Sequence, residues 1–231
     1  MTLTLAQFQD RIGAALMDAA GATFSDATLQ EALRTALHEY TEAAPLAMET
    51  VLVLPADGRE IALDGLAGLI AVTRVWWPYD YAAAAETWPP NRVGRWSLWW
   101  DYGRPVLFLE AADGGQPQAG DEVRIWYTRQ QTIQDLDAAA ATTVPLQDES
   151  MLVQGAAAYA MLSRSTSQAE IASTGAIATP NYAATAFRLL RQFRAGLAAR
   201  RHDATHSPEP AWTDGWALDR WGSPRWLAPR G

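Results

Sequence analysis

Two spacings of apolar residues divide this chain into segments of different predicted structure. From 5 to 19 and from 29 to 40, apolar residues recur every three or four positions, the period of a helix with one buried face. From about 50 to 128 the period is two, and β-branched and aromatic residues are frequent, as is typical of strands. Helical spacing returns at 145–164 and 180–201. The order α-α-β-α-α predicts an α+β fold, with a helical core of about four helices and an inserted small antiparallel β module.

The β region contains about six predicted strands in one sheet. Turn residues "ADG" at 56–58 separate "TVLVLP" from "REIAL", which predicts a hairpin. Residues 78–94, "PYDYAAAAETWPPNRVG", are too long and too rich in Pro and Ala for a tight turn and predict a projecting loop. We expect Trp88, Arg92 and Arg95 to make this loop a contact with a neighbouring subunit or another partner. The other tryptophans of this region are Trp76, Trp77, Trp96, Trp99, Trp100 and Trp126. Alternate members of this set are expected in the core.

The third predicted helix carries acidic residues in its first turn and small residues along one face. Asp148 and Glu149 lie where the helix dipole favours negative charge. Adjacent carboxylates could also serve glycoside hydrolysis, but a place in a helix first turn explains this pair. The small face would let another helix approach closely: Gly155, Ala156, Ala157 and Ala160.

The chain ends in "WTDGWALDRWGSPRWLAPRG", a stretch too short and too irregular to bury its four tryptophans within itself. Pro208 and Pro210 interrupt the helical pattern before it. We therefore divide the chain into a helical core (1–48 and 145–203), an inserted β module (49–133) and an extended C-terminal arm (204–231). The arm is expected to order on a partner or another subunit, and the alternative is a strap folded onto its own domain.

Charge is unevenly distributed along the chain. Residues 1–180 hold 10 Arg and 22 acidic residues, a net of −12, whereas 181–231 hold 8 Arg and 4 acidic residues, a net of +4. The last predicted helix carries Arg188, Arg191 and Arg194 with no acidic residue beside them. The acidic body favours ion pairs of this helix with the same or an adjacent subunit over binding to nucleic-acid phosphates.

Signatures of catalysis are scarce. The absence of cysteine excludes disulfides, thiolate nucleophiles and Cys-ligated zinc. The sequence has no phosphate-binding glycine loop and no nucleophile elbow. "HDATH" at 202–206 has metal-like spacing, but no second histidine cluster supplies further ligands. No apolar run reaches the length of a membrane span, and the N-terminus lacks the pattern of a secretory signal. We expect a soluble protein that is not an enzyme and has no metal or cofactor.

The order of elements and four stretches of sequence resemble the head-to-tail adaptor (connector, or head completion) proteins of tailed bacteriophages. The similarity covers roughly residues 5–165 and rests on patterned apolar positions. The four stretches are "LHEYTEAAPL" (37–46), "VLVLPADGREIALDGLAGLIAVTRVWWP" (51–78), "AGDEVRIWYTRQQTI" (119–133) and "DESMLVQGAAAYAML" (148–162).

The resemblance implies a structural virion protein, made in the host cytoplasm and located in the neck between capsid portal and tail. Such adaptors form a ring, commonly of twelve copies, that docks under the portal protein and extends the DNA channel. The ring also receives the next neck or tail component, a stopper, tail terminator or nozzle. DNA would pass through without specific binding, and no membrane is involved. Adaptors typically send a C-terminal segment into the portal, so the arm residues expected to bind portal or adjacent subunits are Trp212, Trp216, Arg220, Trp221, Arg225, Trp226 and Arg230.

Two other classes of function stay open. Surface tryptophans could make the chain a carbohydrate-binding or cell-wall-degrading module, because aromatic rings stack on sugars. The Arg-rich helix could make it a nucleic-acid-binding regulator, which would show affinity for DNA that falls steeply with salt.

Overall fold

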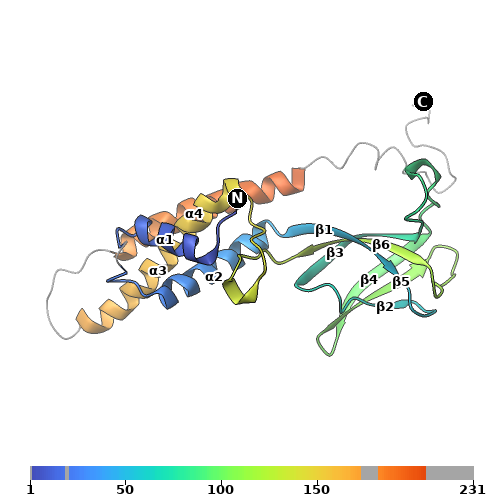
Figure 1. Ribbon diagram of the computed structural model, residues 1–231, viewed down its shortest axis with the longest axis horizontal. Helices are drawn as coiled ribbons and strands as arrows, with labels where there is room; N and C mark the ends of the chain where they lie inside the picture. Colours follow the sequence, from blue (N-terminus) through green and yellow to red (C-terminus); the bar gives the residue numbers. More distant parts are fainter. Residues whose placement is uncertain (1, 19–20, 173–181, 207–231) are drawn as a thin grey trace, which may run out of the picture.

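The computed structural model describes residues 2–18, 21–172 and 182–206. They form two groups of elements that follow one another along the longest axis of the molecule (Figure 1). One group is a bundle of four helices and the other consists of six strands. The helices are α1 (Leu5–Ala15), α2 (Asp26–Ala43), α3 (Glu149–Ala172) and α4 (Tyr182–His206). The predicted α+β class and the α-α-β-α-α order are confirmed. The predicted C-terminal arm from 207 onward lies outside the described residues.

Local capping explains where the first two helices begin. The Thr4 side chain accepts a hydrogen bond from the Gln7 amide while Gln7 accepts one from the Thr4 amide, a capping box. Ser25 caps α2 by accepting from the Thr28 amide. Helix α1 ends at Ala15 and not near 19, because Met17 adopts a left-handed backbone with φ of 57°. Helix α4 continues past the predicted end at 201 as far as His206.

The third helix is the centre of the bundle. Helix α3 contacts α1, α2 and α4, and a three-residue 3-10 turn, η3 (Leu146–Asp148), leads into it. Phe8 and Ile12 of α1, Leu33 of α2 and Phe193 of α4 are fully buried in the same hydrophobic cluster as Leu152 of α3. The bundle therefore has a single core that all four helices share.

The β module differs from the prediction in its pairing. Its strands are β1 (Leu46–Val53), β2 (Glu60–Ala62), β3 (Leu69–Tyr79), β4 (Val93–Asp101), β5 (Arg104–Ala111) and β6 (Glu122–Arg129). They form two antiparallel sheets of three strands, in the orders β1-β6-β3 and β2-β5-β4, and not the one sheet predicted. Val75 and Ile125 of the first sheet share a buried cluster with Leu107 and Leu109 of the second. Two small sheets facing each other bury apolar faces that one open sheet would leave exposed.

The predicted hairpin across residues 56–58 is wrong. Strand β1 pairs with β6, and β2 pairs with β5, so the chain passes from one sheet to the other between them. The turn residues were identified correctly, but a turn does not fix which strand becomes the hydrogen-bonded neighbour. Ile61, at the centre of β2, is buried in the cluster between the two sheets, a burial that favours the pairing of β2 with β5.

The two modules join where α2 leads into β1 and where β6 leads into residues 130–148. Gln131 is buried at this junction, and its side-chain amide donates to the Ala44 carbonyl at 2.9 Å. Its backbone amide donates to the Thr41 hydroxyl at 3.3 Å, and its side-chain oxygen accepts from Thr143 at 2.7 Å. Gln131 thus bonds to both connections between the modules, the one that leaves α2 and the one that leaves β6. It fixes the end of α2 relative to the end of β6.

The small face of α3 is occupied within the chain. Ala156, Ala157 and Ala160 are buried in the bundle core, and Gly155 faces the ring of Phe193 from α4. This confirms that the small residues permit a close approach of another helix. The partner is a helix of the same chain, so these residues are not available for contacts between subunits.

We predict that Gly155→Ala destabilises the bundle. A Cβ atom at Gly155 would lie 2.9 Å from ring carbons of the fully buried Phe193. Overpacking of this kind costs about 1–3 kcal/mol, which outweighs the gain of about 1 kcal/mol from replacing a helical glycine. Gly13→Ala is the matched control, since its nearest neighbour, the Asp18 carbonyl oxygen, is 3.4 Å away. Urea unfolding followed by circular dichroism measures both, and equal stability of the two variants would contradict the prediction.

Candidate interaction surfaces

Two adjacent carboxylates at the start of α3 connect the bundle internally. Asp148 is buried, accepts a hydrogen bond from the Tyr40 hydroxyl at 2.7 Å and pairs with Arg200 of α4, whose Nε lies 2.9 Å away. Glu149 is buried as well, accepts from the Leu3 amide at 3.1 Å and pairs with Arg11 of α1 at 3.4 Å. Both carboxylates are therefore structural, and their oxygens are engaged by four other parts of the chain: the N-terminal segment, α1, α2 and α4.

A second polar cluster connects α2, α3 and α4. Glu39 accepts hydrogen bonds from Arg194 at 2.8 Å and from the Tyr159 hydroxyl. The Arg194 guanidinium, and after it the Tyr159 hydroxyl, lowers the pKa of Glu39 below its ordinary value, although burial opposes the shift. Burial and the adjacent Glu39 raise the pKa of Tyr159. The expected pairing of the Arg-rich helix with the acidic body thus occurs within one chain at Arg194 and Arg200.

The outer face of α4 carries cations that the rest of the described chain leaves without partners. Arg188 and Arg191 are exposed, and among the described residues neither side chain makes a hydrogen bond or an ion pair. Phe187 is exposed beside them at 58% of its surface. Helix α4 carries the whole net positive charge of residues 181–231. Residues 182–206 hold 5 Arg and 1 acidic residue, whereas residues 207–231 hold 3 Arg and 3 acidic residues. This face combines a large apolar ring with positive charge and is a candidate contact surface.

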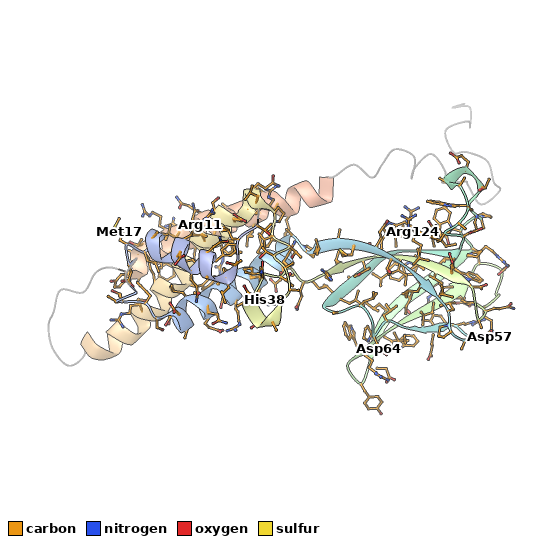
Figure 2. All side chains as sticks on the ribbon, viewed as in Figure 1. Arg11, Met17, His38, Asp57, Asp64 and Arg124 are labelled. Atoms are coloured by element: carbon orange, nitrogen blue, oxygen red, sulfur yellow. The ribbon has the colours of Figure 1, made fainter. Side chains whose placement is uncertain are left out.

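Arginine and aromatic side chains alternate on the outer face of the β1-β6-β3 sheet. Arg124, labelled in Figure 2, lies 4.7 Å from the Trp126 ring centre and 5.2 Å from those of Tyr79 and Trp88. Arg74 lies 4.8 Å from the Trp126 ring and 5.6 Å from that of Trp76. At these distances the positive guanidiniums are attracted to the negative faces of the rings, which is a cation–π interaction. We call this set the Arg–aromatic ladder: Arg74, Trp76, Tyr79, Trp88, Arg124 and Trp126.

The predicted contact loop is shorter than expected and is bound to this ladder. Strand β3 continues to Tyr79 and β4 begins at Val93, so the loop is 80–92, with a short 3-10 turn η1 (Ala85–Thr87). The Trp88 indole donates to the Ala83 carbonyl at 3.1 Å, and its ring packs edge-on against Tyr79. Arg92 pairs with Asp113, and Arg95 is exposed on β4. The role of Trp88, Arg92 and Arg95 in contacts between molecules stays a prediction.

The hairpin between β4 and β5 presents exposed aromatic rings. Alternate tryptophans of the β region were expected in the core, but of the adjacent pair Trp99 and Trp100 neither is buried. Trp100 is 53% exposed, and Trp99, stacked on Phe108 at 5.7 Å, is 38% exposed. Tyr102 is fully exposed at the tip, where it and Gly103 have φ of 46° and 81°, as a two-residue type I′ turn requires. One signal in the sequence could have found this surface, since adjacent tryptophans on a strand point to opposite faces.

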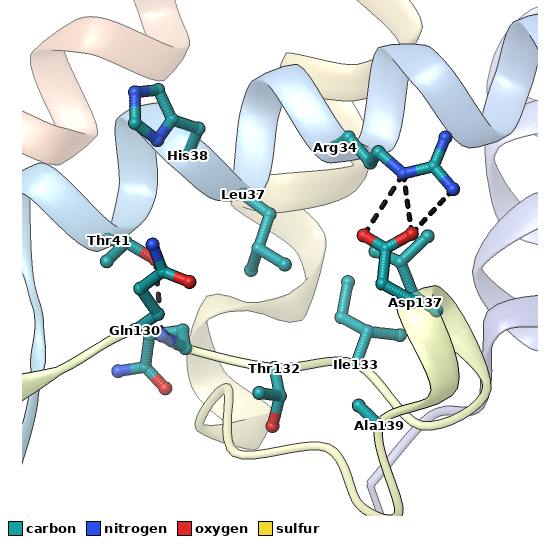
Figure 3. A pocket seen from close by; sticks show the side chains of 11 residues that line it. Arg34, Leu37, His38, Thr41, Gln130, Thr132, Ile133, Asp137 and Ala139 are labelled. Atoms are coloured by element: carbon teal, nitrogen blue, oxygen red, sulfur yellow. Dashed lines mark hydrogen bonds and ion pairs between the residues drawn. The ribbon is translucent and has the colours of Figure 1, made fainter. Parts of the chain in front are cut away.

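A pocket of about 300 Å³ lies between α2 and residues 130–139 (Figure 3). Arg34 closes one end through an ion pair with Asp137 at 2.6 Å, and hydrogen bonds from Arg34 lower the pKa of that carboxylate. His38 lies toward the other end and pairs with Glu42 at 3.5 Å. Asp135, Asp137 and Ala138 all have positive φ, so the wall beside Arg34 is a strained turn. The Asp137 carboxylate at this end of the pocket is thus engaged by Arg34.

Several predicted residues lie outside the described part of the chain. The arm residues Trp212, Trp216, Arg220, Trp221, Arg225, Trp226 and Arg230 are among them. The backbone of "HDATH" is helical as the end of α4. Among the side chains that the structure describes, in residues 2–18, 21–165 and 182–201, no group of acidic or histidine residues has metal-binding geometry. The side chains of His202, Asp203 and His206 lie outside that set. No helix within residues 2–18, 21–172 and 182–206 is long and apolar enough to cross a membrane.

Comparison with solved structures finds likenesses to chains of gene transfer agent (GTA) particles. One, from the virion of a native particle, is 23% identical, with 81% of this chain and 88% of that chain covered and a TM-score of 0.29. Another, from the neck of an empty particle with C6 symmetry, is 24% identical over 81% and 88%, with a TM-score of 0.30. A third, from the neck of a native particle with C12 symmetry, is 22% identical over 82% and 92%, with a TM-score of 0.27. TM-scores of this size do not establish a shared overall fold. No protein-family model matches the sequence, and no curated protein matches it.

We predict that Asp148→Ala destabilises the chain by about 3–5 kcal/mol, because it leaves Tyr40 and Arg200 without their buried acceptor. Tyr40→Phe removes one donor and should cost about 1 kcal/mol, with little further loss when combined with Asp148→Ala. Glu42→Ala, which breaks only an exposed pair with His38, should stay within about 0.5 kcal/mol of wild type. Urea unfolding of the four variants measures these differences. Similar losses for Asp148→Ala and Glu42→Ala would refute the structural role of Asp148.

Proposed function

We propose that this protein is a structural component of the neck of a phage-like particle, an adaptor that docks as a ring under the portal and connects it to the tail. In this proposal the helical core (1–48 and 145–203) and the β module (49–133) form the body of each subunit. The C-terminal arm (204–231) anchors the subunit to the portal or to an adjacent subunit. Residues of the loop around Trp88 contact a neighbour or the next neck component.

The observation that carries the proposal is that the four stretches behind the adaptor resemblance contact one another. Tyr40, in 37–46, bonds to Asp148, in 148–162. Gln131, in 119–133, bonds to Thr41 and to the Ala44 carbonyl. The strands within 51–78 pair with β6, which lies in 119–133. Stretches that are separate in sequence thus form one structural unit, the joint between bundle and β module, which favours a shared architecture over chance similarity of short patterns.

The distribution of exposed groups also supports an assembly role. The bundle presents Phe187 with Arg188 and Arg191, and the β module presents Trp100 and Tyr102. Exposed aromatic and arginine side chains are the residue types that dominate protein–protein contacts. Because one such group lies on each module, a subunit can engage more than one neighbour, as a ring between two other components requires.

The charge of the body suits a channel for DNA. Residues 1–180 have a net charge of −12, and several of their arginines are engaged in ion pairs within the chain. Like charge prevents tight contacts with phosphates, so DNA could slide past such a surface without being retained. A nucleic-acid-binding regulator would require the opposite balance.

A second candidate function is carbohydrate binding, which the exposed rings of the β4–β5 hairpin favour. Trp99 stacks almost parallel to Phe108, at an interplanar angle of 27°, and Trp100 and Tyr102 are exposed nearby. Exposed aromatic faces are suited to stacking on sugar rings. Such binding would require only this surface and no catalytic pair.

The adaptor proposal predicts that the chain binds portal rings and that binding depends on the arm. We expect full-length protein mixed with the portal protein of the same particle to form rings visible by negative-stain imaging. A chain ending at His206 should keep the circular dichroism of the wild type but bind portal roughly 100-fold or more weakly, since anchoring tryptophans contribute about 2 kcal/mol or more each.

The control for charge on α4 is a matched pair of double variants. Arg188→Glu with Arg191→Glu should reduce ring formation, whereas Arg188→Lys with Arg191→Lys, which keeps both charges, should retain most of it. No association of the full chain with portal would reject the adaptor function. Normal binding by the chain ending at His206 would reject only the role of the arm.

The carbohydrate alternative predicts that peptidoglycan fragments or polysaccharides shift the tryptophan fluorescence of the full chain. Trp99→Ala combined with Trp100→Ala should abolish that shift, whereas Trp88→Phe, whose ring packs against its own chain, should preserve it. The absence of any response across a broad glycan panel would remove this alternative.

A further inference from the structure

The Arg–aromatic ladder contains two arginines in matching surroundings. Trp126 of β6 is flanked by two guanidiniums, that of Arg124 at 4.7 Å and that of Arg74 at 4.8 Å from its ring centre. Each arginine also lies near a second tryptophan, Trp88 for Arg124 and Trp76 for Arg74. The ladder therefore offers an internal comparison between two cations held by the same kind of contact.

The first of these cations has a carboxylate partner. Arg124 donates to Glu49 of β1 at 2.7 Å and to the Tyr79 hydroxyl at 3.1 Å, and its side chain is only 17% exposed. Arg124 thus combines aromatic neighbours with hydrogen bonds to two oxygen atoms, made by two of the five N–H donors of its guanidinium.

The second cation lacks the oxygen half of this arrangement. Arg74 is partly buried against its two rings, yet in the part of the chain that the structure describes its guanidinium makes no hydrogen bond and no ion pair. Glu49 cannot supply it, because Trp126 stands between Glu49 and Arg74 in the sheet register. Glu122, a carboxylate on the same strand as Trp126, already accepts a hydrogen bond from the Tyr81 amide at 2.8 Å.

We propose that Arg74, held between Trp76 and Trp126, is a binding site for a carboxylate supplied by an aspartate or glutamate of another molecule. The two ring contacts restrict the Arg74 side chain, so less conformational freedom is lost when a ligand binds its N–H donors. A planar carboxylate matches the fork of N–H donors, and the adjacent ring contacts reduce competition from water. The Arg124–Glu49 pair is the example of this chemistry within the same ladder. The site goes beyond the proposed neck function and does not depend on it.

The site is tested on the full chain by NMR, through the arginine Nε–Hε signals, with the Arg74 signal assigned by its loss in Arg74→Gln. The probe is N-acetyl-L-glutamate α-amide, whose only charge is its side-chain carboxylate, and the matched uncharged compound is N-acetyl-L-glutamine α-amide. At constant ionic strength we expect the glutamate compound to move the Arg74 signal to saturation. The glutamine compound should not move it.

The reference within the same spectra is Arg95, which is exposed on β4 and has no ring contact of this kind. A response of Arg74 no larger than that of Arg95 would overturn the proposal, as would saturation by inorganic phosphate at lower concentration than by the glutamate compound. Sedimentation of wild type and Arg74→Gln then separates the sources of the carboxylate. If Arg74→Gln self-associates more weakly than wild type, the carboxylate comes from a second copy of this chain. If the two proteins sediment equally although the glutamate compound saturated the Arg74 signal, the carboxylate comes from a different molecule.

Discussion

The adjacent buried carboxylates of Asp148 and Glu149 are the interaction on which the arrangement of the bundle depends. They lie where η3 passes into α3, and between them they bind α1, α2, α4 and the N-terminal segment. Buried carboxylates are costly unless every oxygen is engaged, so a bundle in which Tyr40 or Arg200 moved away would leave an uncompensated charge. Hydrophobic contacts alone permit helices to slide and rotate. The requirement to satisfy both carboxylates at once selects one arrangement of four helices around α3.

The same constraint extends to the β module through α2. Tyr40, which bonds to Asp148, lies one residue before Thr41, which accepts from the Gln131 amide at the junction. The end of α2 is thereby fixed against both α3 and the segment that leaves β6. The direction in which β1 departs from the bundle follows from these bonds, and β1 and β3 are both paired to β6. The positions of the exposed hairpin at Tyr102 and of the Arg–aromatic ladder relative to α4 are consequences of this joint.

Charged groups inside the molecule and at its surface differ in how completely they are paired. Arg11, Arg194 and Arg200 all bind carboxylates of the bundle. The arginines left without a carboxylate partner in the described chain, Arg188 and Arg74 among them, lie at its periphery beside exposed or half-buried rings. The proposed function and the proposed carboxylate site both rest on these unpaired cations.

By itself the sequence determined the kind and order of the elements. Period and capping are local properties, so the spacing of Phe8 and Ile12 and the cap at Ser25 were sufficient to predict helices, and Gly155 was sufficient to predict a close helix contact. Only the tertiary structure decided which strands pair, which rings are buried and what the Asp148–Glu149 pair does. These properties depend on residues far apart in the chain, 108 positions in the case of Tyr40 and Asp148. Spacing along a strand shows that Trp99 and Trp100 face opposite sides of their sheet. How much of each ring stays exposed depends on how the strands pair and how the two sheets pack.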